Sequence, residues 1–158
     1  MKKISLTQSC FALVDDADFE WLSKWKWYAH YDPTIKGYYV MRNVGGRPIY
    51  MHQEIAKADF GMEVDHVDRN PLNNQRSNLR IVTHSQNQIN RSKQKNNTSG
   101  FRGVCKERNK WRAWVWVKGK KTNCGAFDTP EEAARAYDKT ARDLHGDFAY
   151  QNFPLERQ

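Results

Sequence analysis

Four polar side chains in the segment 65–87 could carry out one reaction together. Asp65 and His66 are adjacent, Asn78 follows His66 by twelve residues, and Asn87 follows Asn78 by nine. An imidazole titrates near neutral pH, so His66 is a candidate general base. The carboxylate of Asp65 and the carbonyl oxygen of Asn87 are ligands that a hard divalent cation prefers. The segment therefore predicts a metal-assisted reaction in which a base removes a proton.

The flanking sequence predicts a strand, a polar loop, a second strand and a helix around these residues. In chain order the first three are expected at 63–67, 68–78 and 79–82. Thr83, with Gln86 three residues later, forms a capping box that begins the helix carrying Asn87. Because neighbouring side chains leave opposite faces of a strand, Asp65 and His66 can serve one site only where the strand ends.

Residues 63–91 resemble the HNH nuclease family in residue type, order and spacing. The matching positions are Val64, Asp65, His66, Asn74, Asn78, Leu79, Arg80, Asn87 and Asn90. The resemblance implies a ββα-metal architecture that hydrolyses a DNA phosphodiester with one divalent ion. It implies Asp65 and Asn87 as the metal ligands and His66 as the base that deprotonates the attacking water. Asn78 is expected to hold the loop after His66 and so to orient the imidazole.

The identity of the metal and of the phosphate-binding residues follows from the side chains around the motif. Asn87 stands where many members of the family have a histidine, and an oxygen ligand favours Mg²⁺ or Mn²⁺ over Zn²⁺. Arg80 and Arg91 are the first candidates to clamp a phosphate of the DNA backbone. His52 and His84 also lie near the motif, and both are interpreted as structural residues.

The composition predicts a folded, basic protein with a polyanionic partner. The 158 residues include 26 Lys and Arg against 18 Asp and Glu, a net charge of +8, and 13% are aromatic. Such an aromatic content argues against a wholly disordered chain, and basic residues interleaved with aromatic ones favour nucleic acid. No apolar run reaches the length of a membrane span, and three cysteines are too few for a disulfide framework. We therefore expect a protein of the cytoplasm of a bacterial or phage-infected cell.

The charge is concentrated in the second part of the chain, which suggests two domains. Residues 1–91 hold 12 basic and 10 acidic residues, whereas residues 92–158 hold 14 and 8. Between these blocks, a polar stretch without large apolar residues is typical of a linker. We expect a nuclease domain at 1–91 with its core motif at 63–91, a linker at 92–99, and a DNA-binding domain at 100–158. In the first block, strands are expected at 37–41 and 48–51 and a helix at 52–60.

The second block predicts a three-stranded antiparallel sheet packed on one helix. The strands are expected at 103–106, 111–118 and 121–127. In the middle strand, alternation puts one set of residues toward the helix, namely Trp111, Ala113, Val115 and Val117. Thr129, Pro130 and Glu132 mark the start of the helix. The two blocks together predict the α+β fold class.

The second block also resembles the DNA-binding domain of plant Apetala-two/ethylene-response-factor proteins over about residues 99–154. The matching segments are 100–104, 111–113, 125–134, 136–138 and 145–146. In that family the sheet enters the major groove of double-stranded DNA. The candidate DNA contacts, including two linker lysines, are Lys93, Lys95, Arg102, Arg108, Arg112, Trp114, Trp116, Lys118 and Lys121. Plant members have arginine where Cys105 and Trp116 stand and an acidic residue in place of Trp114, so their base-reading set does not transfer.

The two resemblances together imply a sequence-specific homing endonuclease of the phage or mobile-element type. One alternative is a DNA-binding or regulatory protein that does not cleave. Another is an RNA-binding protein that uses the exposed aromatic residues of the sheet. The sequence leaves open whether the protein is a monomer or a homodimer, whether it cuts one strand or two, and what residues 1–50 do.

Overall fold

The computed structural model describes residues 1–90 and 97–154. The chain forms two compact units, Met1–Asn87 and Gln88–Gln158, which we call the N-terminal and the C-terminal unit. Three residues expected to bind DNA lie outside the described residues, namely Arg91, Lys93 and Lys95. Within the described ranges, no helix is long and apolar enough to cross a membrane.

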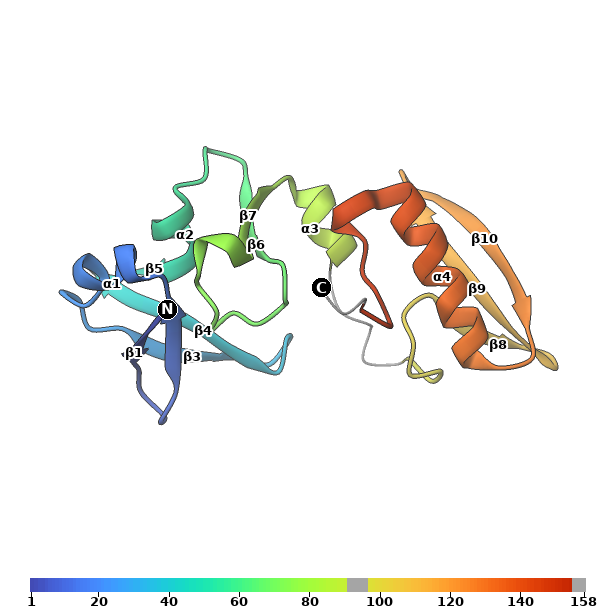
Figure 1. Cartoon of the computed structure of the whole chain (residues 1–158), viewed down its shortest axis with the longest axis horizontal. Coiled ribbons are helices and arrows are strands. Elements are labelled where there is room, and N and C mark those ends of the chain that lie inside the picture. The colour runs from blue at the N-terminus through green and yellow to red at the C-terminus, as the bar shows by residue number, and fades with distance from the viewer. Residues whose placement is uncertain (91–96, 155–158) are drawn as a thin grey trace. The chain divides into compact units, whose positions relative to one another are not determined.

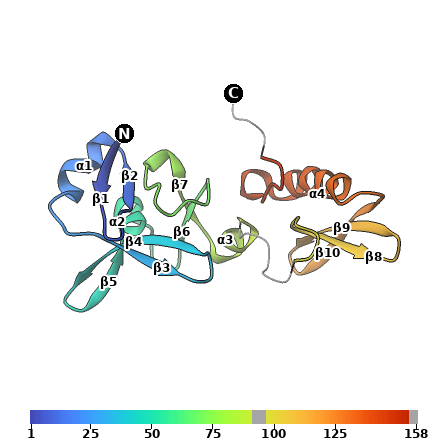
Figure 2. The ribbon, with the colours of Figure 1, turned by 90° about the horizontal axis from the view of Figure 1, so that it is seen from below.

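The N-terminal unit consists of short antiparallel sheets and short helices (Figures 1 and 2). Its elements are β1 (Lys2–Ser5), β2 (Phe11–Val14), α1 (Asp16–Leu22), β3 (Tyr28–Asp32), β4 (Gly37–Val44), β5 (Arg47–Tyr50), α2 (Met51–Ala56), β6 (Glu63–His66), β7 (Leu79–Val82) and the first part of α3 (His84–Asn90), a helix that continues past the boundary at Asn87. A 3-10 turn, Arg76–Asn78, precedes β7. Strands β1 and β2 pair with each other, β3, β4 and β5 form a second sheet, and β6 pairs with β7.

One apolar cluster holds the first sheets and helices of this unit together. It consists of Ile4, Ala12, Val14, Leu22, Trp27, Val40, Met51 and Ile55, all buried. The indole nitrogen of Trp27 donates to the carbonyl of Leu22 over 2.9 Å, so its one polar atom is satisfied inside the cluster. The cluster includes Met51 and Ile55 of α2, the helix that also carries His52, and thereby anchors that helix.

The expected strands around Gly45 and Gly46 are present as β4 and β5, but the helix expected at 52–60 is shorter. It ends at Ala56, because Lys57 adopts the left-handed conformation with φ of 50°. A residue in that conformation terminates a helix by letting its N–H bond back to the last turn, as the Lys57 N–H does to the carbonyl of Gln53.

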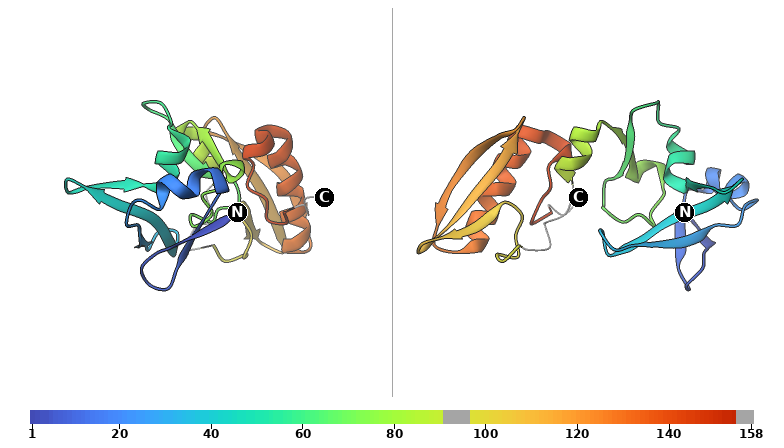
Figure 3. Two further views of the ribbon diagram at one scale, coloured as in Figure 1. Left: turned by 60° about the vertical axis from the view of Figure 1, so that its left-hand side comes forward. Right: turned by 180° about the vertical axis from the view of Figure 1, so that it is seen from behind.

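The C-terminal unit is a three-stranded antiparallel sheet covered on one face by a long helix (Figure 3). Its elements are β8 (Val104–Glu107), β9 (Lys110–Val117), β10 (Lys120–Phe127) and α4 (Pro130–His145). The predicted capping box is present, since the Thr129 hydroxyl accepts from the Glu132 N–H and the Glu132 side chain accepts from the Thr129 N–H. The α+β fold class, and this sheet packed on a helix, are therefore confirmed.

Small apolar side chains allow the helix to lie close to the sheet. Ala133, Ala134 and Ala141 of α4 are fully buried against Ala113 and Val115 of β9. Gly103 approaches Tyr137 so closely that a Cβ atom at residue 103 would overlap ring atoms Cδ2 and Cε2. Only a residue without a side chain fits there.

Candidate active site

Strands β6 and β7 present the predicted site residues on two faces. Asp65 lies opposite Arg80, and Glu63 lies opposite Val82. Opposed residues of antiparallel strands share a face, and alternate residues of one strand point the same way, so Glu63, Asp65 and Arg80 share one face. His66, the last residue of β6, belongs to the other face.

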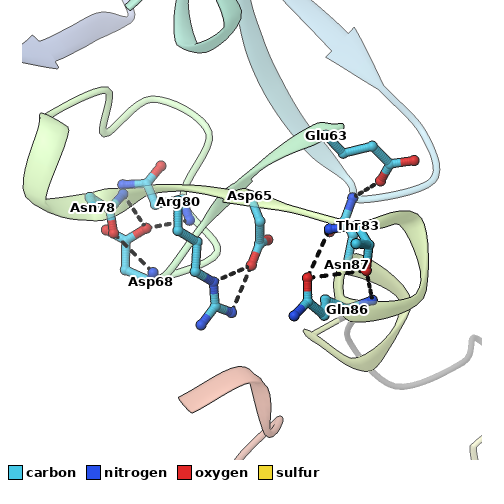
Figure 4. A network of polar contacts seen from close by, with 9 residues as sticks. Glu63, Asp65, Asp68, Asn78, Arg80, Thr83, Gln86 and Asn87 are labelled. Atoms are coloured by element: carbon cyan, nitrogen blue, oxygen red, sulfur yellow. Dashed lines mark hydrogen bonds and ion pairs between the residues drawn. The ribbon is translucent and has the colours of Figure 1, made fainter. Parts of the chain in front are cut away.

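Asp65 forms a hydrogen-bonded ion pair with Arg80. Nε and Nη2 of Arg80 both donate to Oδ2 of Asp65, over 2.9 and 2.7 Å (Figure 4). The side chains are 10% and 17% exposed, so both charges are largely removed from water. A charge-assisted contact in such a place is stronger than one on the surface. The pair therefore fixes the Asp65 carboxylate on this face.

Glu63 connects β6 to α3 on the same face. Its Oε2 accepts from Nδ2 of Asn87 over 2.5 Å, and its Oε1 lies 2.7 Å from Nδ1 of His84. The contact with Asn87, and next that with His84, lowers the pKa of Glu63. The amide nitrogen of Asn87 faces Glu63, so the carbonyl oxygen of this amide lies on the side away from Glu63 (Figure 4).

The start of α3 sets the position of Asn87. The predicted capping box is present: the Thr83 N–H donates to Oε1 of Gln86 over 2.8 Å, and the Gln86 N–H donates to the Thr83 hydroxyl over 3.3 Å. The Asn87 N–H donates to the Thr83 carbonyl over 3.0 Å, so Asn87 lies one helical turn after the cap.

His66 is enclosed by the loop after β6 and by α2. Its Nε2 lies 3.4 Å from Oδ1 of Asn74, and its ring meets the His52 ring edge-on, with 5.0 Å between centroids and an angle of 76°. Burial lowers the pKa of His66, against opposing contributions from Asn74, Asp68 and Asp65. A neutral imidazole is the form that accepts a proton.

His52 is buried in a cluster of rings. Tyr39 and Tyr50 lie on it, at centroid distances of 5.9 and 5.4 Å, beside the contact with His66. Burial, and secondarily the neighbouring His66, lowers the pKa of His52 to about 3. Its Nδ1 is buried without a hydrogen-bond partner among the described residues. These contacts show packing around His66, which is compatible with the structural role expected for His52.

Asn78 contacts both ends of the loop that follows His66. Its Oδ1 accepts from the Asp68 N–H over 3.0 Å, and its Nδ2 donates to Oδ1 of Asp68 over 2.9 Å (Figure 4). The same Nδ2 donates to the carbonyl of Asn73 over 2.8 Å. Its carbonyl accepts from the Val67 N–H over 2.9 Å. One buried side chain thus closes the loop across ten residues.

The N-terminal hairpin holds the outer part of the same loop. Leu13 of β2 donates to the carbonyl of Leu72 and accepts from the Asn74 N–H, each over 2.8 Å. Asp15 accepts from the Arg76 N–H over 2.8 Å, and the buried Asp18 forms two 2.8 Å contacts with the Arg76 guanidinium. Sequence reasoning assigned no role to residues 1–50; β2 and α1 hold the loop that encloses His66.

The metal ligands expected from the sequence are of a suitable type. Asp65 supplies a carboxylate and Asn87 a carboxamide, and oxygen donors of this kind suit Mg²⁺ or Mn²⁺. The guanidinium of Arg80 on Asp65 shows that this position stabilises positive charge. In residues 1–90 and 97–154, no three side chains of His, Cys, Asp or Glu are grouped so that they could hold a metal.

The outward face of the C-terminal sheet carries four of the predicted DNA contacts, namely Arg112, Trp114, Trp116 and Lys121. Trp116 is 62% exposed, and Lys121 faces it across the strand pair. Trp114 is half-buried, with the Lys121 ammonium 4.0 Å from its ring centroid. Arg112 forms a 3.0 Å ion pair with Glu107. Both indoles lie on the face away from α4, as the alternation predicts.

The remaining candidates lie in turns and at the edge of this unit. Arg108 lies in the turn between β8 and β9, and Lys118 in the turn between β9 and β10, each with positive φ. Arg102 precedes β8 and has its guanidinium 5.1 Å from the Tyr150 ring centroid. The two turns place cationic side chains at opposite ends of β9.

Comparison with known proteins identifies the family. The family model described as HNH endonuclease matches residues 51–89. An uncharacterized HNH endonuclease of Acanthamoeba polyphaga mimivirus is 35% identical over 146 residues, which are 90% of this chain and 74% of the relative. The chain belongs to the HNH endonuclease family. Protein 3.8 of Escherichia phage T7 is 43% identical over 91 residues, covering 56% of this HNH endonuclease and 74% of the phage protein.

The second resemblance also has relatives, over a smaller part of the HNH endonuclease. An ethylene-responsive transcription factor of Arabidopsis thaliana is 44% identical over 63 residues, or 37% of this chain and 24% of the plant protein. An APETALA2-like protein of Oryza sativa is 40% identical over 60 residues, or 37% of this chain and 14% of that protein. No solved structure matches the chain.

In this HNH endonuclease, Asp65 and Arg80 are in contact. Asn87 reaches the same face of the strands because its side chain donates a hydrogen bond to Glu63. The His66 ring lies against different partners, His52 and Asn74. Glu63 was not among the candidates, although its position two residues before Asp65 on a strand puts both on one face.

Proposed function

We propose that this HNH endonuclease is a homing-type enzyme that hydrolyses double-stranded DNA at a preferred sequence. Asp65 and Asn87 hold one divalent cation, Mg²⁺ or Mn²⁺, and His66 is the general base. The observation that carries the proposal is the end of β6, where a carboxylate and a buried imidazole are consecutive and α3 is tied to the carboxylate face by Glu63. Relatives from a phage and a giant virus support action inside an infected cell.

Each residue of the proposed site has a separate role in phosphodiester hydrolysis. His66 accepts a proton from water, the water oxygen forms a bond to phosphorus, and the bond from phosphorus to the 3′ oxygen breaks, with solvent protonating that oxygen. A bound divalent cation supplies positive charge that offsets the charge of the five-coordinate phosphorus. Arg80, which pairs with Asp65, is proposed to bind a phosphate oxygen of the backbone. Asn78 holds the His66 loop closed.

The C-terminal unit is proposed to hold the DNA duplex with its sheet. Trp114 and Trp116 offer flat apolar surfaces, and Arg102, Arg108, Arg112, Lys118 and Lys121 offer cations to the phosphates. The linker lysines Lys93 and Lys95 are expected to follow the backbone, and Arg91 to bind a phosphate near the site. The plant relatives, named for transcription factors, support DNA as the partner. Neutralising phosphates releases counterions, so we expect affinity to fall steeply with salt.

Plasmid cleavage tests the proposal directly. Supercoiled plasmid is incubated with the protein and Mg²⁺ or Mn²⁺, with a chelator control, and nicked and linear products are separated on a gel. His66→Ala is expected to slow cleavage roughly 10²–10⁴-fold, the contribution of a positioned base. His30→Ala is the matched control, because His30 is an exposed histidine of β3 in the same unit.

Two results would overturn the proposal. If His66→Ala cleaves at the wild-type rate, His66 is not the base. If the protein binds duplex DNA tightly and cleaves with neither Mg²⁺ nor Mn²⁺, it is the non-cleaving DNA-binding protein that the sequence leaves as an alternative.

A further inference from the structure

Asn74 is the most completely buried polar side chain next to the proposed base. It has no exposed surface. Its backbone N–H donates to the carbonyl of Leu13, and its side-chain Nδ2 donates to the carbonyl of Pro71 over 3.1 Å. Both contacts are to main-chain carbonyls, one in β2 and one in the loop itself. The asparagine is therefore held at its backbone and at one end of its amide.

The contact with Pro71 determines which end of the amide faces His66. A main-chain carbonyl has no hydrogen and only accepts hydrogen bonds, so the atom that faces the Pro71 carbonyl must be the amide nitrogen. The oxygen is then the end directed at the imidazole. This agrees with the 3.4 Å separation between Oδ1 of Asn74 and Nε2 of His66.

The orientation of the amide in turn determines the tautomer of the imidazole. An amide oxygen only accepts, so Nε2 of His66 must carry the hydrogen that lies between them. A neutral imidazole has a single N–H, so Nδ1 carries the lone pair. His52 packs against the ring at 5.0 Å and 76° and restricts its rotation, which would move Nε2 away from Asn74 and put a ring carbon in its place.

We propose that Asn74 is a positioning residue that selects the Nε2–H tautomer of His66 and so makes Nδ1 the nitrogen that accepts the proton of the attacking water. The tautomer is a property of the folded protein by itself, whereas its consequence for catalysis rests on the proposed function. Asn74 acts through His66 and does not touch the DNA. Its role differs from that of Asn78, whose contacts are with Asp68 and Asn73 rather than with the ring.

Nitrogen NMR detects the tautomer of His66 independently of any DNA cleavage assay. In long-range proton–nitrogen spectra of the full-length protein labelled at histidine, the His66 signals are assigned by their loss in His66→Gln. With the ring neutral, we expect the protonated type of signal from Nε2 and the unprotonated type from Nδ1. The opposite pattern in the wild-type protein would overturn the inference.

Two variants of Asn74 separate positioning from a structural role. Asn74→Leu keeps the size of the side chain and removes the acceptor, so the two tautomers of His66 should mix and kcat for plasmid nicking should fall roughly 10–100-fold, with KM little changed. Asn74→Asp keeps an acceptor and should keep the Nε2–H tautomer. The matched control is Asn70→Ala, an exposed asparagine of the same loop, which should leave both readouts unchanged.

Each outcome decides between the alternatives. A folded Asn74→Leu protein with the wild-type tautomer and kcat would overturn the inference. If Asn74→Leu does not fold, the decision rests on the wild-type spectrum and on Asn74→Asp, where loss of the Nε2–H tautomer counts against it. If the tautomer is as expected but His66→Ala cleaves normally, the proposed function fails and the assignment of the tautomer stands.

Discussion

The two units of the chain bury different kinds of side chain. The N-terminal unit buries a set of polar and charged residues, namely Asp18, Arg42, His52, Asp65, His66, Asn74 and Asn78. The core of the C-terminal unit consists mainly of alanine and valine, and its buried Asp138 accepts from the N–H groups of Asn152 and Phe153. Apolar packing is non-directional, whereas a buried hydrogen bond depends on both the distance and the angle between its donor and its acceptor. The unit proposed to cleave therefore carries the directional contacts, and the unit proposed to bind carries the close packing.

Replacing Gly103 should have the largest effect and should break the C-terminal unit alone. In Gly103→Ala the new Cβ would overlap the Tyr137 ring and lie 2.7 Å from the carbonyl of Trp114, at a φ of +73°. We expect a loss of more than about 3 kcal/mol in the free energy of unfolding of this unit. Calorimetry should show its transition shifted while that of the N-terminal unit stays in place.

Gly119→Ala is the matched control for this prediction. Gly119 has a similar φ of +78° but no atom within 4 Å of the added Cβ, so only the backbone strain of roughly 1 kcal/mol applies. Equal losses in the two variants would show that helix-to-sheet packing is not what Gly103 permits.

Removing Arg76 should weaken the N-terminal unit next most. Arg76→Ala leaves the Asp18 carboxylate, 3% exposed, with one remaining side-chain donor, Trp21. Because Arg76 is itself 57% exposed, part of its charge is screened, and we expect a loss of about 2 kcal/mol. Denaturant unfolding measures this loss of free energy. The control is Arg47→Ala, a change of an exposed arginine of β5, which should stay within about 0.5 kcal/mol of wild type. If Arg47→Ala lowered the free energy of unfolding as much as Arg76→Ala, the contact between Arg76 and Asp18 would have no special role in stability.

Acid should destabilise the N-terminal unit more than the C-terminal one. The pKa of His52 is about 3 in the folded protein against 6.5 in the unfolded chain, so the unfolded state takes up the proton first. The stability from this group is present above pH 6.5 and is lost as the pH falls toward 3. The loss is about 1.4 kcal/mol per pH unit, with His66, whose pKa is also lowered, adding in the same direction.

Denaturant unfolding at several pH values checks this dependence. His52→Gln should reduce the slope of stability against pH between 6.5 and 5, compared with wild type. An unchanged slope would mean that His52 is not buried as a neutral ring. The C-terminal unit has a single histidine, His145, which is only half-buried, and this unit should change less.

Trp116 should have the smallest effect on stability. Because its side chain is exposed, Trp116→Ala should change the free energy of unfolding by less than about 0.5 kcal/mol, yet weaken binding to a DNA duplex by roughly 1–3 kcal/mol if the indole stacks on it. Lys118→Ala should instead lower the slope of log affinity against log salt by about one. Titrations at several salt concentrations measure both, and unchanged affinity in both variants would place the DNA elsewhere.

Local signals predicted most of the elements. The alternation from Trp111 to Lys118 is period-two over a full strand, and the capping boxes at Thr83 and Thr129 satisfy helix ends with residues three apart. Each of these features is decided by neighbours in the chain. The end of α2 was missed because Lys57, in the left-handed conformation, has no side-chain signal for a helix end.

Long-range contacts could not be read from the sequence. The hydrogen bonds between Leu13 and the loop join residues about sixty positions apart in the chain. They are formed by main-chain atoms, which every residue type except proline supplies in full. The types of the candidate ligands and base were readable, but their partners Glu63, Asn74 and Arg76 were either not selected or not given these roles. A glutamate on a short strand and an asparagine in a turn are common, and only the folded structure shows what they touch.

The hydrogen bonds between β2 and the loop have a consequence for transplanting this motif. A peptide limited to residues 51–89, the stretch that the family model matches, would contain Asp65, His66 and Asn87. It would lack β2, whose Leu13 forms hydrogen bonds with Leu72 and Asn74 of the loop. Any scaffold that receives the motif must supply a free strand edge in the place of Leu13. We therefore expect that residues 51–89 by themselves do not keep the loop in this conformation, and that Leu13 and Asp15 belong to the shortest segment that does.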